Sequence, residues 1–158
     1  MANTQSLCTS FLSELMTATH NFGTAPTRAV TSADTFKGAL YLASATINAA
    51  TTVYTTSGEV TGTNYTAGGV TITNATAPTS TNTSATAGTA YWTPSASVTY
   101  TNVTLGTAFD TMLLYNSSQS NKAVGAYTFG SQTITAGNFT LTMPSNTTSL
   151  ALIRLSTT

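Results

Sequence analysis

From residue 24 onward, threonine alternates with large apolar and aromatic residues along much of the chain, and it accounts for 39 of the 158 residues. Successive side chains of a strand point to opposite faces, so this alternation is typical of strands that bury one face. β-Branched and aromatic residues favour that environment. Gly, Asn and Pro interrupt the pattern at short intervals, as turns require. The pattern therefore predicts an all-β domain.

The spacing predicts eight or nine short antiparallel strands in a β-sandwich or jelly-roll-like domain. Segments 36–44 and 109–116 are apolar on both faces, so we expect them to be central strands. The other predicted strands are 51–56, 69–74, 90–93, 97–105, 122–129, 138–143 and 149–155. The alternation slips near Asn102 and again at Gly125, where we expect a bulge.

The N-terminal region has a different periodicity. Over residues 4–20 the apolar residues recur at i, i+1, i+4, i+5, i+8 and i+9, which is one face of a helix. They are Leu7, Cys8, Phe11, Leu12, Leu15 and Met16. We therefore predict one amphipathic helix that precedes the β domain.

A helix of this length is marginal on its own, so its apolar stripe must be buried. It packs either on the chain's own sheet or on a neighbouring subunit. Residues 24–35 look like an extended linker, which favours the second alternative slightly. We divide the chain into a helical arm, 1–23, and a β-sandwich domain, 24–158. Within the domain, residues 74–89 lack a large apolar residue and are predicted to be an exposed low-complexity loop.

Charge is scarce in this chain. Only 5% of the residues are charged and the formal net charge is zero, whereas a typical domain has about 25% charged residues. The sequence has no basic footprint for nucleic acid and no run of about 18 apolar residues for a membrane helix, so we expect neither partner. Low net charge favours association. The composition therefore indicates a component of an assembly.

Few residues are suited to catalysis. His20 and Cys8 are the single histidine and cysteine, and we interpret them as a helix-end residue and a buried apolar residue. The acids are Glu14, Asp34, Glu59 and Asp110. Asp110 lies in an apolar strand, where we expect a cross-strand pair with Lys122 or Arg154. We predict no enzymatic activity, no metal and no cofactor, since no ligand cluster has a recognisable spacing.

Five segments spread over the whole chain carry a resemblance. They are MANTQSLCTSF at 1–11, DTFKGALYL at 34–42, GEVTGTNYTAGGV at 58–70, AYWTPSAS at 90–97 and LYNSSQSNKAV at 114–124. Together they resemble small structural proteins of tailed bacteriophages. The resemblance implies a virion component that is assembled in the bacterial host cytoplasm. It transfers no catalytic or ligand-binding residue.

Among virion roles we favour a capsid decoration, or cement, protein that braces neighbouring capsid subunits. Its expected partners are the major capsid protein or other virion proteins, and a homotrimer or homodimer suits a capsid axis. The hypothetical interface comprises Leu7, Phe11, Leu12, Leu15 and Met16. The alternatives are a tail or neck component, and a head-fibre or tail-fibre adhesin. An adhesin would bind a host glycan through Tyr91 and Trp92, although packing is the commoner role of such aromatics.

Overall fold

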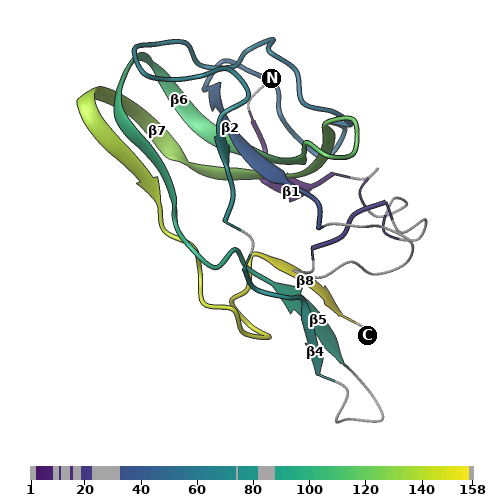
Figure 1. The fold of residues 1–158 in the computed structure, drawn as a ribbon. Coiled ribbons are helices and arrows are strands. Elements are labelled where there is room, and N and C mark those ends of the chain that lie inside the picture. Colours follow the sequence, from purple (N-terminus) through teal and green to yellow (C-terminus); the bar gives the residue numbers. More distant parts are fainter. Residues whose placement is uncertain are drawn as a thin grey trace.

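The computed structural model describes residues 3–8, 11, 15, 19–22, 33–73, 75–81 and 88–156. These residues are mostly β-strand and form two antiparallel sheets (Figure 1). The predicted all-β class is confirmed.

Eight strands are described. They are β1 (Ser6–Leu7), β2 (Phe36–Leu42), β3 (Val70–Thr71), β4 (Thr79–Thr81), β5 (Thr89–Trp92), β6 (Val98–Asn116), β7 (Lys122–Leu141) and β8 (Ile153–Ser156). The large sheet has the order β1-β7-β6-β2-β3, and the small sheet has the order β4-β5-β8. Figure 1 shows the small sheet projecting below the large one.

The centre of the large sheet is a long hairpin of β6 and β7, with 19 and 20 residues. Residues 106–108 of β6 bulge opposite residue 133, and residues 129–131 of β7 bulge opposite residue 110. Bulges bend strands and increase their twist, which accounts for the curved hairpin in Figure 1. The sequence predicted four separate strands here, because the bulged residues interrupt the alternation.

Both predicted irregularities are confirmed. Asn102 has a φ of 50°, and β6 gains a residue there, because Tyr100 pairs with Phe139 but Val103 pairs with Gly137. The second shift lies beside Gly125. In that bulge Leu114 pairs with Gly125 and Tyr115 pairs with Ala123, which leaves Val124 as the surplus residue.

Two strands were not predicted, and one predicted strand is reduced to a bridge. β4 lies within the stretch 74–89, which was predicted as a loop, and β1 lies within the predicted helix. The predicted strand 51–56 contributes the isolated bridge Val53–Lys122. Short polar strands such as β4 carry no apolar alternation, so the pattern could not reveal them.

The helix predicted over residues 4–20 is not supported. Ser6 and Leu7 are extended and pair with Ala126 and Gly125 of β7. Phe11 and Leu15 have helical backbone geometry, whereas residues 9–10, 12–14 and 16–18 lie outside the described residues. The apolar spacing is real, but its first residues cover the edge of the large sheet instead.

Hydrogen bonds explain why the chain is extended here. The amide N–H groups of Thr4 and Cys8 donate to the carbonyl oxygens of Ile47 and Val124. The side chain of Asn3 accepts from the N–H of Ile47 and donates to the carbonyl oxygen of Leu42. A helix over these residues would keep its backbone bonds internal and leave the edge of β7 unpaired.

The two sheets are joined by aromatic packing. The ring of Phe22 stacks on Phe36 of β2, with centroids 4.4 Å apart, and it packs on Trp92 of β5 at 4.7 Å. All three side chains are buried and belong to the same hydrophobic core. The described part of the N-terminal segment therefore helps to hold the small sheet against the large one.

Candidate functional site

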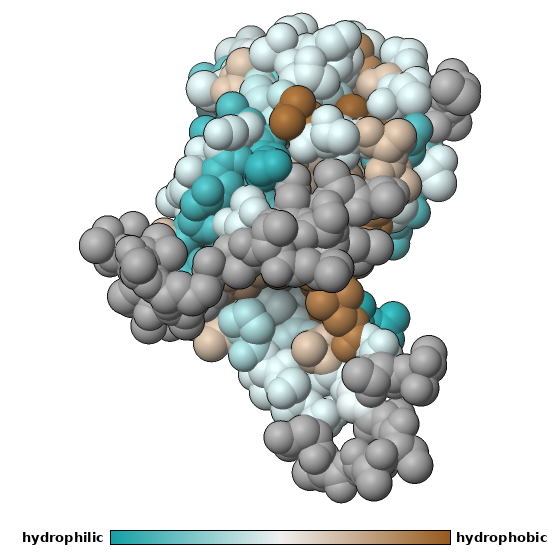
Figure 2. Space-filling view, turned by 90° about the vertical axis from the view of Figure 1, so that its right-hand side faces the viewer, coloured by the Kyte–Doolittle hydropathy of each residue, from teal (hydrophilic) through white to brown (hydrophobic). Residues whose placement is uncertain are grey.

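An apolar groove of about 430 Å³ lies between the small sheet and the described residues of the N-terminal segment, beside the aromatic contacts that join the two sheets, and we call it the inter-sheet groove. Residues of β5 and β8 line one side, among them Ala90, Trp92 and Leu155. Phe11 and Leu15 of the N-terminal segment line the other. None of the described lining residues is Asp, Glu, Lys or Arg. Figure 2 shows apolar surface at the waist of the molecule, above the paler small sheet.

The register of the small sheet creates the apolar side of the groove. Trp92 pairs with Ile153 and Ala90 pairs with Leu155, so all four side chains share one face of the sheet. Trp92 is only 2% exposed, whereas Leu155 is 39% exposed. The face is therefore buried near Trp92 and open near Leu155.

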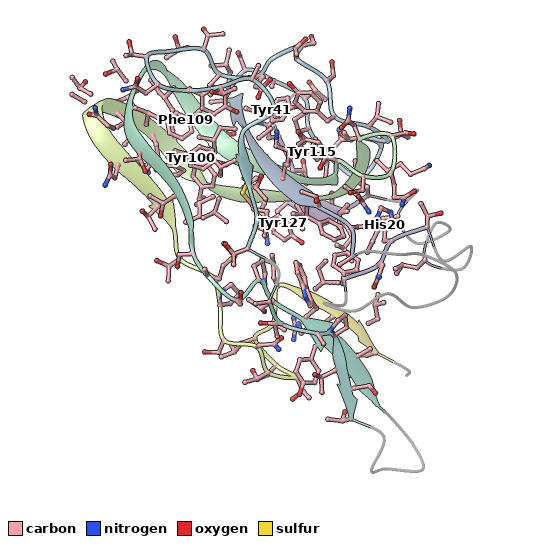
Figure 3. The ribbon with its side chains drawn as sticks, viewed as in Figure 1. His20, Tyr41, Tyr100, Phe109, Tyr115 and Tyr127 are labelled. Carbon is pink, nitrogen blue, oxygen red and sulfur yellow. The ribbon has the colours of Figure 1, made fainter. Side chains whose placement is uncertain are left out.

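A buried polar network contacts His20 and Asn21, which line the groove. The Oδ1 of Asn116 accepts from the N–H of Ser118, so its amide group faces Asp34 and His20. The Nδ2 of Asn116 is 2.7 Å from the Oδ2 of Asp34 and 3.1 Å from the Nδ1 of His20. Since Nδ2 can only donate, the Nδ1 of His20 accepts this hydrogen bond. Figure 3 places His20 beside one end of β2.

Asp34 serves the fold in this network. Its Oδ1 accepts from the Nε2 of Gln119 at 3.0 Å, and its Oδ2 also accepts from the N–H of Asn21 at 2.9 Å. The buried carboxylate thereby ties the start of β2 to the β6–β7 turn and to the N-terminal segment. The amide of Asn116, rather than a carboxylate, contacts the Nδ1 of His20. The network orients the imidazole at the groove.

A second carboxylate is enclosed by tyrosines. Glu59 is 6% exposed and accepts hydrogen bonds from the hydroxyls of Tyr54 and Tyr65 and from the N–H of Gly68, at 2.6, 2.7 and 2.7 Å. We call Glu59, Tyr54 and Tyr65 the tyrosine cage. Burial raises the pKa of both tyrosines above its usual value, and the hydrogen bond to Glu59 raises it further.

Asp110 and Arg154 do not form the pair expected from the sequence. The Oδ1 of Asp110 accepts from the side chains of Asn3 and Thr111, at 2.6 and 2.7 Å. The Nη1 of Arg154 donates to the carbonyl oxygen of Ser149 at 2.7 Å. Asp110 therefore helps to fix the N-terminal segment to the large sheet, as Asp34 does.

The predicted interface residues are divided by the structure. Phe11 and Leu15 line the inter-sheet groove, and Phe11 is fully buried in the chain's own core. Leu7 is half-buried in β1 and lines a different cleft. Leu12 and Met16 lie outside the described residues. Sequence reasoning missed the contribution of β8, although Ile153 and Leu155 alternate as a one-sided strand would.

The two candidate glycan-stacking residues have different environments. Trp92 is buried, and its Nε1–H donates to the carbonyl oxygen of Thr76 at 2.9 Å. Tyr91 is half-buried and lines the inter-sheet groove. The packing interpretation is thus confirmed for Trp92, whose ring face is not available for stacking on a sugar.

The thiol of Cys8 is fully buried and lies 3.9 Å from the carbonyl oxygen of Asn48. In the part of the chain that the structure describes, no three His, Cys, Asp or Glu side chains form a metal-binding group. No helix among those residues is long and apolar enough to cross a membrane.

No known protein family, curated protein or solved structure matches this chain.

Proposed function

We propose that this protein is a structural component of a bacteriophage particle, which decorates the capsid and braces neighbouring capsid subunits. The observation that carries the proposal is the inter-sheet groove. Its described lining residues are mostly apolar and include no Asp, Glu, Lys or Arg, and its outer end stays open at Leu155 on a molecule rich in hydroxyl groups. Such a surface is stabilised when a partner covers it. The resemblance of the sequence to phage structural proteins supports a phage particle as the assembly.

The distribution of charge supports a permanent interface. The chain has only four acidic residues, and three of them, Asp34, Glu59 and Asp110, accept hydrogen bonds from within the chain. With four acidic and four basic residues in the whole chain, few charged groups can steer a transient encounter. Obligate interfaces are the more apolar class, and they resemble a domain core cut in two. We therefore expect docking through apolar contact and hydroxyl hydrogen bonds.

We extend the proposal to the architecture and to the partner. The two sheets act as one sandwich-like unit, because the contacts of Phe22 with Phe36 and Trp92 join them. The expected arm, residues 1–23, shares the docking surface, since Phe11 and Leu15 line the groove. The partner is the major capsid protein or another virion protein, and a trimer or dimer at a capsid axis would repeat the contact.

Cryo-electron microscopy of the particle that carries this chain tests the role. Decoration predicts density at many equivalent positions over the shell, with the inter-sheet groove covered by a capsid subunit. Density confined to the tail or to one vertex would replace decoration with the tail, neck or fibre alternative. Absence of the chain from the particle would refute the proposal.

A matched pair of variants tests the groove itself. Leu155→Glu places a charge at its open end, and we expect particle incorporation to be lost because a charge resists apolar burial. Val53→Glu is the control, since Val53 is also exposed, at 46%, but does not line the groove. We expect each free variant to keep its stability within about 0.5 kcal/mol, as surface substitutions do. Equal incorporation of the two variants would contradict the role of the groove.

A further inference from the structure

A second cleft is bordered by two strands that lie at sheet edges. β8 is the outermost strand of the small sheet, and β1 is the outermost strand of the large sheet. A cleft of about 610 Å³ is lined by Leu7 of β1, by Gln5 just before it, and by Arg154 and Ser156 of β8. We call it the edge cleft.

The edge cleft and the inter-sheet groove use opposite faces of β8. Ile153 and Leu155 line the groove, whereas Arg154 and Ser156 line the cleft. This division follows from the two-residue period of a strand. Substitutions at different residues of β8 can therefore test the two surfaces separately.

The backbone of β8 offers hydrogen bonds along its outer edge. In an antiparallel pair, alternate residues direct both N–H and C=O away from the partner strand. β8 pairs with β5 on one side, and the described residues provide no strand on its other side. Arg154, Leu155 and Ser156 are all exposed. An exposed edge of this kind is a template for the addition of a strand.

The chemistry of the cleft selects the incoming strand. Arg154 is the one charged side chain among the described residues that line it. The bond from its Nη1 to Ser149 holds the guanidinium in place and leaves its other donors available. Leu150, also a lining residue, is 58% exposed and can pack against an apolar side chain. A segment that fits the edge cleft is extended, has an acidic residue at one position and has an apolar residue beside it.

We propose that an extended acidic segment of a different protein chain binds in the edge cleft as an added strand on β8, with a carboxylate opposite Arg154. A second copy of this chain fits less well. Its described carboxylates, Asp34, Glu59 and Asp110, all accept hydrogen bonds from within their own fold. This inference does not depend on the virion role.

Synthetic peptides test the proposal on the full chain. The first probe is an eight-residue peptide of alternating Thr and Val with one central Glu, and the second carries Lys instead. Fluorescence anisotropy should show the Glu peptide binding at least tenfold more tightly than the Lys peptide. Arg154→Glu should reverse this preference, while Lys122→Glu, which removes the same charge from β7, should preserve it. N-methylation of alternate peptide residues should abolish binding, because it removes the backbone donors.

Three results would overturn the proposal. The first is the absence of binding by the Glu peptide. The second is equal affinity for the Glu and Lys peptides, or for the N-methylated and unmodified peptides. The third is a dimer of this chain, seen by sedimentation equilibrium and lost in Arg154→Glu, because a second copy would then be the occupant of the edge cleft.

Discussion

The tyrosine cage and the inter-sheet groove bury side chains in opposite ways. In the cage, Glu59 receives three hydrogen bonds from Tyr54, Tyr65 and Gly68, so each group has a fixed partner. In the groove, most of the described lining residues are apolar, and Leu155 at its rim stays exposed. Buried polar groups demand particular partners, whereas an apolar surface accepts any well-fitting apolar one. The cage therefore specifies the fold, and the groove is left for association.

The cage also secures the connection between β2 and β3. The hydroxyl of Tyr115 donates to the carbonyl oxygen of Gly68, and that of Tyr41 donates to the carbonyl oxygen of Thr55 at 2.5 Å. The N–H of Leu40 donates to the hydroxyl of Tyr65. These bonds connect β2 and β6 to the long loop between β2 and β3, which contains little regular structure. Figure 3 shows Tyr41 and Tyr115 in the large-sheet half of the molecule, away from the small sheet.

The largest expected effect comes from Gly69, next to the cage. Its φ is +69°, and a Cβ built there would lie 1.7 Å from the carbonyl oxygen of Gly38. Gly69→Ala would therefore separate β3 from β2, and we expect a loss of about 4 kcal/mol or more of unfolding free energy in urea denaturation. Gly130→Ala is the control, because Gly130 has a similar φ of +78° but open space around it. We expect that variant to lose only about 1–2 kcal/mol. Equal losses would contradict close packing at the cage.

Removal of the cage carboxylate should have the next largest effect. Glu59→Ala leaves two hydroxyls and one N–H without their acceptor, so we expect a loss of about 3 kcal/mol. Glu59→Gln keeps one acceptor oxygen and should lose less. Chemical denaturation of both variants measures the difference. A loss below about 1 kcal/mol in Glu59→Ala would mean that the cage does not specify the fold.

Alkaline pH should lower the free energy of unfolding through the buried tyrosines in and around the cage. Burial raises the pKa of Tyr65 and Tyr100 above the unfolded value of about 10. Their contribution to stability is complete below pH 10, and it is lost above pH 10, where the unfolded chain releases protons that the folded chain retains. Each such tyrosine lowers the unfolding free energy by about 1.4 kcal/mol per pH unit. Tyr65→Phe should reduce this slope, and an unchanged slope would exclude Tyr65 as a contributor.

A smaller effect is expected at the buried end of the groove. Trp92→Phe keeps an aromatic ring against Phe22 but removes the hydrogen bond to Thr76 and some volume. We expect a loss of about 1–2 kcal/mol in urea denaturation. A loss greater than that of Glu59→Ala would reverse the comparison, because the groove rather than the cage would then dominate stability.

The sequence predicted much of the fold but little of the cage. Alternation identified the strands that bury one face, and the slips at Asn102 and Gly125 correctly located two bulges. It could not show that residues 106–108 bend one long strand rather than separate two. The sequence predicted no role for Glu59, because its partners Tyr54 and Tyr65 are brought to it by the folded loop and not by a motif.

The N-terminal segment shows a second limit of sequence reasoning. The apolar spacing of Leu7, Phe11 and Leu15 fits a helix, yet Leu7 lies in β1 and lines a different cleft from the other two. Periodicity reports which residues are apolar, whereas the tertiary structure decides which surface each one covers. The unpaired edge of β7 provided backbone partners that outweighed the helical pattern over residues 6–7.

Hydrogen exchange of the chain, free and on its particle, tests the division between fold and association most directly. The account predicts that amides of residues 75–81 and 88–92, which include groove residues and their neighbours, become protected on the particle. Amides of residues 53–69, which surround the cage, should exchange at the same rates in both states. Unchanged exchange along the groove, together with new protection around the cage, would contradict the account.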